Sequence, residues 1–212
     1  MIGLLVVPKT HHKHEYSLKT NRLPFVGLGS LWILLLAGCN EFFYYPSPLQ
    51  FSSPKALGLS YESVTFSSSD GTELTGWFIP ALGAPEAVLG TVIQFHGNAE
   101  NMSSHWLSLS WLPFNHYHLF TFDYRGYGRS KGSPDLDGPI QDSMAALHYI
   151  QQRKEVNPQE VIVIGQSLGG ALAIAAVALG KPEGIRAIVL ESTFSSYKRI
   201  AQEKLSGIWE LA

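Results

Sequence analysis

Beyond residue 87 the chain alternates between short, continuously apolar runs and longer segments whose apolar residues recur every three or four positions. The runs with the length of strands are 87–95, 117–124, 160–165 and 184–192. Unbroken apolar strands are typical of a sheet that is covered on both faces. Helical patterns follow the first three runs, at 98–112, 139–153 and 168–180. This alternation predicts an α/β domain with a mostly parallel sheet, right-handed crossovers and helices on both faces.

The part of the chain that precedes these elements divides into two segments. Residues 61–80 hold two strand-like runs around the turn sequence SSSDG, which predicts a hairpin. Residues 40–58 hold three prolines and show no clear period, so we interpret them as a tether. The folded domain is therefore expected to occupy residues 59–212.

The first 39 residues have the pattern of an export signal. A basic stretch ends at Arg22, and an uncharged, mostly apolar run follows and closes with small residues. The sequence Leu36-Ala37-Gly38-Cys39 resembles the bacterial lipoprotein box, in which the cysteine is lipidated and becomes the new N-terminus. The resemblance implies a signal peptide at 1–39 and a protein that Cys39 anchors to a membrane, on the extracytoplasmic side of the cell envelope.

An uncleaved membrane helix is the alternative for the same run, which is just long enough to span a bilayer. Pro24, Gly27 and Gly29 weaken the first half of such a helix. Asn40 differs from the aspartate that resembles an inner-membrane retention signal, which favours the outer membrane where the cell has one. Cys39 is the only cysteine, so the chain has no internal disulfide.

Composition narrows the classes of partner and cofactor. The chain has 212 residues, enough for one medium-sized domain, and a net charge of −2. It has no basic patch, so we do not expect nucleic acid as a partner. No His, Asp and Glu cluster has the spacing of metal ligands, and HHKH at 11–14 is only a weak metal tract inside the basic leader. We expect neither a metal nor a cofactor.

The segment Gly165-Gln166-Ser167-Leu168-Gly169 matches the G-x-S-x-G pattern of a nucleophile elbow. A predicted strand precedes it and a predicted helix follows it, which is the context that this motif requires. Gly165 and Gly169 are small enough for the strand and the helix to approach each other, and a helix N-terminus favours developing negative charge. A glycine-rich packing turn is the purely structural alternative, but the strand–helix frame favours a nucleophile at Ser167.

Two further motifs accompany the elbow. QFHGNAEN at 94–101 follows one predicted strand, and FDYRGYGRS at 122–130 follows another and matches the pattern D-x-R-G-x-G-x-S. With the elbow, they resemble the alpha/beta-hydrolase superfamily, and the chain is similar to serine aminopeptidases and monoacylglycerol lipases from about residue 60 onward. The resemblance implies an alpha/beta-hydrolase fold and a serine hydrolase that cleaves an ester, thioester or amide in a small acyl compound or a peptide.

The resemblance also implies roles for individual residues. The oxyanion hole would use the backbone N–H of Leu168, directly after the serine, and that of Asn98, directly after His96-Gly97. His96 would shape its loop and would not act as the base. Asp123 and Arg125 would fix their own loop, and an internal ion pair between them is one form of this interpretation.

No histidine of the chain occupies the position of the family's catalytic base. In this fold the order is Ser, then Asp or Glu, then His. Every histidine precedes Ser167, since the eight are His11, His12, His14, His96, His105, His116, His118 and His148. Glu191 is a possible acid because it ends the last predicted strand, where a minority of such enzymes place one. The same stretch is also an ordinary strand end.

A helical pattern from residue 195 reaches the last residue without a stop signal, and we expect a front part of a longer hydrolase that lacks the last strands. The strand at 184–192 would then be an exposed apolar edge. One interpretation is a lipid-anchored serine hydrolase that a His and an acid from outside this chain complete. Another is a non-catalytic fragment or a binding protein. A base donated through an altered fold by His105, His116, His118 or His148 is a third.

Overall fold

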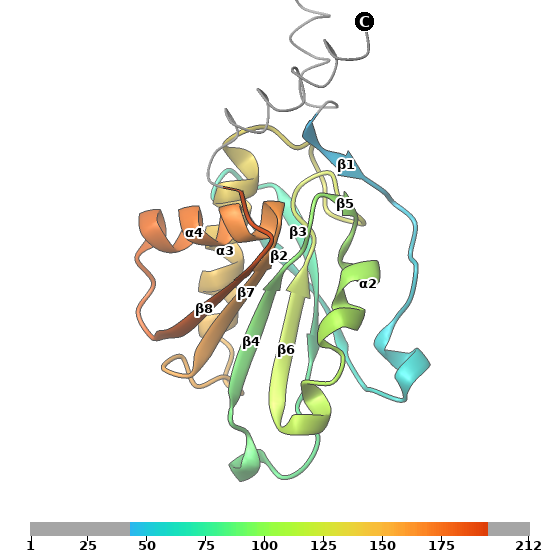
Figure 1. Ribbon diagram of the computed structural model, residues 1–212, viewed down its shortest axis with the longest axis vertical. Helices are drawn as coiled ribbons and strands as arrows, with labels where there is room; N and C mark the ends of the chain where they lie inside the picture. Colours follow the sequence, from blue (N-terminus) through green and yellow to red (C-terminus); the bar gives the residue numbers. More distant parts are fainter. Residues whose placement is uncertain (1–42, 195–212) are drawn as a thin grey trace, which may run out of the picture. The chain divides into compact units, whose positions relative to one another are not determined.

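A six-stranded sheet organises the computed structural model, which describes residues 43–194 (Figure 1). Every described residue belongs to one compact unit of the chain, Gly38–Ala212. The strands are β2 Glu62–Ser67, β3 Glu73–Ile79, β4 Gly90–Phe95, β6 Tyr117–Phe122, β7 Val161–Gln166 and β8 Ile185–Glu191. They lie in the order β2-β3-β6-β4-β7-β8.

The directions of the strands confirm a mostly parallel sheet. β6, β4, β7 and β8 run parallel to one another, whereas β3 is antiparallel to both β2 and β6. β2 and β3 form the hairpin that SSSDG predicts. Its turn closes because Asp70 Oδ1 accepts a hydrogen bond of 3.0 Å from Thr72 N–H and because Gly71 adopts the left-handed φ of 85°.

Two long helices form where the periodicity predicts them, at α3 Gly138–Gln151 and α4 Leu168–Gly180. The helix expected over 98–112 is much shorter: α2 covers Met102–His105 and continues as a 3-10 turn to Leu109. It starts late because Ala99–Glu100 is extended, as the short strand β5. Asn101 then caps α2, with its side chain accepting a hydrogen bond from Ser103 N–H.

The continuously apolar strands β4 and β6, in the middle of the sheet, are buried on both faces, as their composition predicts. One buried cluster combines side chains of β4, β6 and β7 with those of α3 and α4, and Phe122 and Leu147 belong to it. A second cluster, which includes Trp77 and Trp106, packs β3, β4 and β6 against α2. Figure 1 shows α3 and α4 on one side of the sheet and α2 on the other. Helices on both faces are therefore confirmed.

Residues 43–52, which we call the N-terminal strap, are bound to the domain along their length. Strand β1 Tyr45–Pro46 pairs in parallel with β5 Ala99–Glu100. Asn101 Nδ2 donates to the carbonyl oxygens of Ser47 and Leu49, at 2.7 and 2.6 Å. These residues belong to the segment 40–58, which is predicted from the sequence to be a tether. In the structure their backbone groups take part in the hydrogen bonding of the domain.

Arg125 makes a buried ion pair, but its partners differ from Asp123, the partner that the sequence suggested. Its Nη2 lies 2.8 Å from Asp142 Oδ1, on α3, and its Nη1 lies 2.8 Å from Asp70 Oδ2, in the hairpin turn. The hydrogen bonds to Asp142 raise the pKa of the Arg125 guanidinium above its usual value. A pair between Asp123 and Arg125 is therefore wrong. Side chains that follow the end of a strand can point in different directions. The side chain of Arg125 turns toward α3.

β8 forms one edge of the described sheet, as expected of the strand at 184–192. Three of its apolar residues, Ile188, Val189 and Leu190, are 39%, 48% and 44% exposed. The predicted signal peptide at 1–39, Cys39 and the helical pattern from residue 195 lie outside the described residues. Among residues 43–194, none of the helices combines the length and the apolar character needed to cross a membrane.

Replacing Arg125 by Met is expected to lower the free energy of unfolding by about 3–5 kcal/mol, because the fully buried Asp142 loses its partner. Urea denaturation followed by circular dichroism measures the change. Arg186→Gln is the matched control, since that guanidinium is 63% exposed beside Glu160 and its removal should leave the midpoint unchanged. Equal midpoints for Arg125→Met and Arg186→Gln would contradict a stabilising role for the buried pair.

Candidate active site

Ser167 lies in a strained turn between β7 and α4. Its φ of 51° and ψ of −113° fall in a region that residues with a side chain rarely adopt. The turn is held because Ser167 N–H donates a 2.8 Å hydrogen bond to the carbonyl oxygen of Glu191, at the end of the neighbouring strand β8. Ser167 directly precedes α4, so its hydroxyl stands at the positive end of a 13-residue helix.

The glycines of the elbow leave no room for a side chain. A Cβ at Gly169 would lie 2.0 Å from the carbonyl oxygen of Phe95, and a Cβ at Gly165 would lie 2.6 Å from Cα of Gly170. Real atoms do not approach this closely, so a larger residue would force α4 away from β4 and β7. Glycine at these two positions therefore brings the first turn of α4 against the end of β4.

This close approach brings two chain segments together. β4 and β7 are parallel neighbours, with Phe95 opposite Gly165, so the loop after β4 and the elbow after β7 emerge at the same edge of the sheet. The backbone N–H groups of Asn98, in this loop, and of Leu168, in the elbow, donate no hydrogen bond within the described part of the chain. The site thus presents a serine hydroxyl and, on the two adjoining segments, two N–H groups available to an acceptor.

The strap and the loop that follows β6 hold Asn98 in place. Its Nδ2 donates to the carbonyl oxygen of Phe43. The hydroxyl of Tyr127 lies 2.7 Å from Asn98 Oδ1 and 2.9 Å from the Asn98 carbonyl oxygen. Both polar ends of the side chain and the backbone carbonyl are therefore occupied. The sequence reveals neither contact, because Phe43 and Tyr127 lie 55 and 29 residues away in the chain.

His96 and Asp123 are buried under the same loops. His96 Nδ1 lies 2.7 Å from the carbonyl oxygen of Gly97, and its Nε2 lies 3.4 Å from Asp123 Oδ1. Asp123 Oδ1 also accepts a 2.7 Å hydrogen bond from the N–H of Met102, the first residue of α2. These contacts tie the loop after β4 to the end of β6, which is the structural kind of role expected for both residues.

His105 bridges the elbow and the loop after β4, a role that its place on α2 does not reveal in the sequence. Its Nδ1 lies 3.2 Å from Gln166 Oε1, and its Nε2 lies 3.0 Å from the carbonyl oxygen of Ala99. Burial lowers the pKa of the imidazole below its usual value, and the neighbouring His96 lowers it further. Both ring nitrogens therefore face groups other than the Ser167 hydroxyl.

The other histidines considered as donors of a base have different partners. His118 Nδ1 accepts a hydrogen bond from Ala81 N–H, His116 faces Leu82, and His148 faces Gln152. Within residues 43–194, no side chain makes a hydrogen bond with the hydroxyl of Ser167. Glu191 touches the elbow through its backbone carbonyl, while its exposed carboxylate makes no ion pair in the described part. No group of three or more His, Cys, Asp or Glu side chains there could hold a metal ion.

A family model described as the alpha/beta hydrolase fold matches residues 90–209, more than half of the chain. The chain belongs to the alpha/beta hydrolase family. It is 46% identical over 168 residues to the protein YfhR of Escherichia coli O157:H7, a match that covers 79% of this chain and 58% of that protein. Over 183 residues it is 34% identical to the alpha/beta hydrolase domain-containing protein WAV2 of Arabidopsis thaliana, with 81% of this chain and 58% of that protein covered.

Solved structures show the same fold for this alpha/beta hydrolase. The Pyrococcus furiosus esterase Pf2001 superimposes with a TM-score of 0.66 at 24% identity, over 80% of this chain and 63% of the esterase. Acetyl xylan esterase 1 of Thermoanaerobacterium superimposes with a TM-score of 0.57 at 21% identity, over 70% and 53% of the two chains. The chain spans about three fifths of the length of the curated relatives it matches.

Replacing Ser167 by Gly is expected to stabilise the fold relative to Ser167→Ala, by roughly 1–2 kcal/mol, because glycine adopts a φ of 51° without steric strain. Both variants lack the hydroxyl, so the comparison isolates the backbone. The free energy of unfolding from urea denaturation measures the difference. If Ser167→Gly is no more stable than Ser167→Ala, the elbow stores no strain at this residue.

Proposed function

We propose that this alpha/beta hydrolase is a serine hydrolase with Ser167 as its nucleophile. The observation that carries the proposal is the strained elbow at Ser167, at the same edge of the sheet as the loop of Asn98, together with the N–H groups of Leu168 and Asn98, which have no acceptor among the described residues. Strained backbone conformations are concentrated at functional sites in proteins. A strained turn between a strand and a helix, with a serine at its centre, is suited to acyl transfer. The fold points to a small molecule as the substrate.

In the proposed reaction, Ser167 Oγ attacks the carbonyl carbon of an ester, thioester or amide while a base removes its proton. The carbonyl oxygen gains negative charge and accepts hydrogen bonds from the N–H groups of Leu168 and Asn98. Each such donor contributes about 3 kcal/mol to stabilisation of the transition state in comparable sites. Collapse of this tetrahedral species expels the alcohol, thiol or amine, and water then releases the acid. Esters are the first class to test, because both superimposed proteins are esterases.

The base and the acid are proposed to come from outside this chain. Every histidine precedes Ser167, and within the described residues none bonds to its hydroxyl. The curated relatives are longer than the matched region, which leaves room for a histidine and a carboxylate in their remaining length. The same observations support the second candidate, a protein that binds an acyl compound without turnover, because an elbow without its base loses most of its rate.

The first experiment labels the 212-residue protein with a fluorophosphonate probe and follows p-nitrophenyl acetate turnover, each with and without added imidazole. If Ser167 is a nucleophile that lacks its base, labelling is slow, and imidazole accelerates it because it can accept the proton. Ser167→Ala is the matched control, and it also corrects for hydrolysis of the acetate by imidazole itself. We expect no labelling of this variant.

The other outcomes separate the two candidates. Rapid labelling and turnover without imidazole, both lost in Ser167→Ala, would contradict the missing base and place it within this chain. Absence of labelling in soluble, folded protein, even with imidazole, would contradict the nucleophile and favour the binding protein.

We also propose that the hydrolase is anchored to a membrane, on the extracytoplasmic side of the cell envelope, by a lipid on Cys39. The support is the box Leu36-Ala37-Gly38-Cys39 after a basic stretch and an apolar run. The described fold begins only a few residues later, since the strap docks from Phe43 onward. The catalytic domain would then lie close to the membrane surface, without a long flexible linker.

Replacing Cys39 by Ser is expected to abolish incorporation of labelled palmitate, because serine has no thiol to accept the lipid. Labelling of cells that express each form measures this effect. The matched control is Ser30→Ala, which changes a hydroxyl in the same run and leaves the box intact. Undiminished palmitate in Cys39→Ser would contradict lipidation at this residue.

A further inference from the structure

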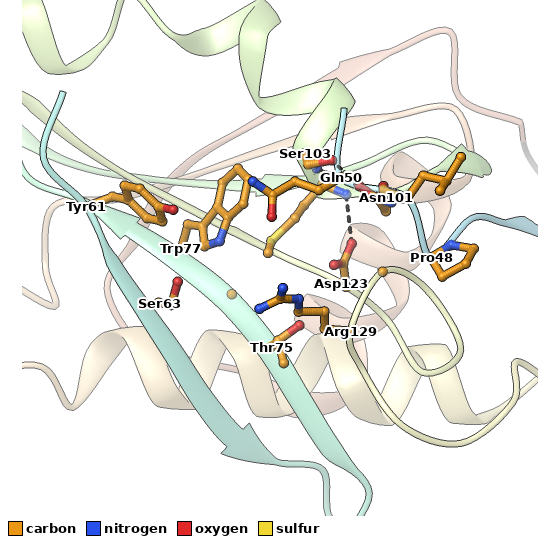
Figure 2. Close-up of a pocket in the computed structure, with 14 residues that line it drawn as sticks. Pro48, Gln50, Tyr61, Ser63, Thr75, Trp77, Asn101, Ser103, Asp123 and Arg129 are labelled. Atoms are coloured by element: carbon orange, nitrogen blue, oxygen red, sulfur yellow. Dashed lines mark hydrogen bonds between the residues drawn. The ribbon is translucent and has the colours of Figure 1, made fainter. Parts of the chain in front are cut away.

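A small pocket lies on the α2 face of the sheet, away from α3 and α4. It has a volume of about 90 Å³. The strap, the beginning of β2, the middle of β3, the start of α2 and the loop after β6 enclose it (Figure 2). Its lining includes neither Ser167 nor Asn98, so it is distinct from the candidate active site. We refer to it as the strap pocket.

Two hydrogen-bond donors, the Trp77 indole N–H and the Arg129 guanidinium, line the strap pocket without a partner among the described residues. The indole N–H of Trp77 has no acceptor in the described part of the chain, and its nitrogen is not among the buried polar atoms, so a ligand in the pocket can reach it. The guanidinium of Arg129 makes no ion pair or hydrogen bond with any described residue. Figure 2 shows Trp77 and Arg129 reaching toward the same space from opposite sides. An N–H group and a guanidinium that line one pocket, with no acceptor among the described residues, are available to an acceptor on a ligand.

Other side chains of the pocket limit what that acceptor can be. Tyr61 packs on Trp77 with ring centroids 5.2 Å apart, and Met102 adds a second apolar wall. The carboxyl group of Asp123 also lines the pocket, and a carboxylate there would oppose a dianion more strongly than a monoanion. A ligand with one negative charge for Arg129 and a short apolar body for Tyr61 and Met102 suits the two donors and the apolar walls. A carboxylate has this chemistry, and it accepts two donors at once.

We propose that the strap pocket binds a small aliphatic monocarboxylate. The carboxylate accepts hydrogen bonds from the Trp77 indole N–H and the Arg129 guanidinium, and the aliphatic chain lies against Tyr61 and Met102. Leu49 and Gln50 of the strap form part of the wall, so a bound ligand also holds the strap against the domain. This site stands independently of catalysis by Ser167, since it shares no residue with the elbow.

Butyrate is the probe, and the indole N–H resonance of Trp77 is the readout. The chain has five tryptophans, so Trp77→Phe identifies this resonance by its disappearance and retains a ring in the core. In a titration of the 212-residue protein followed by ¹H–¹⁵N NMR, we expect the Trp77 resonance to shift and saturate with butyrate. Butyramide, which has the same shape without the charge, is expected to bind at least about tenfold more weakly.

Two substitutions locate the binding. Arg129→Gln removes an exposed charge and is expected to weaken butyrate binding at least about tenfold. Arg186→Gln, the matched control on β8, and Ser167→Ala, at the elbow, should both leave the affinity unchanged. A failure of the proposed hydrolase activity would therefore not affect this result.

Several results would overturn the proposal. They are a Trp77 resonance that does not move with butyrate beyond the effect of sodium chloride, an unchanged affinity in Arg129→Gln, and a loss of binding in Ser167→Ala, which would place the carboxylate at the elbow. Tighter binding of inorganic phosphate or of butyramide than of butyrate would equally exclude a monocarboxylate site.

Discussion

The contact between the first turn of α4 and the end of β4 is the constraint on which the rest of the candidate site depends. A single added carbon at Gly169 would lie 2.0 Å from the Phe95 carbonyl oxygen, so the two elements touch through backbone alone. Because they touch, the serine before α4 and the loop after β4 share one edge of the sheet. The strained backbone of Ser167 is supported by the hydrogen bond that its N–H donates to the end of β8.

The strap extends this arrangement to the N-terminal side of the domain. Its carbonyl of Phe43 holds the Asn98 side chain, and its strand β1 pairs with the residues that follow Asn98. A few residues further on, the strap closes the pocket that Trp77 and Arg129 line. One ten-residue segment thus holds the side chain of Asn98, the proposed oxyanion donor, and forms part of the wall of a separate cavity, so movement of the strap would affect both.

The alternation of apolar runs and helical periods determined most of the architecture. Strand and helix identity depend on the spacing of apolar residues over a few positions, and this spacing is a local property. The hairpin, the parallel order of the later strands, α3, α4 and the exposed edge at β8 could therefore be predicted. The elbow could be recognised for the same reason, because its glycines and serine are consecutive. The predicted helix over 98–112 was too long, because Ala99 and Glu100 pair with β1 as a strand. This pairing is not a local property of the sequence, since β1 lies more than fifty residues earlier.

Only the tertiary structure decided which distant side chains meet. Arg125 pairs with Asp142 and Asp70, not with its near neighbour Asp123, because packing of α3 and the hairpin turn brings those carboxylates to it. His105 reaches Gln166 across 61 residues, and Trp77 and Arg129 line the same pocket, which no sequence pattern marks. Such meetings depend on how the sheet, helices and strap pack together. The sequence by itself thus determined the elements and the elbow, whereas packing decided the ion pairs, the supports of the candidate site and the pocket.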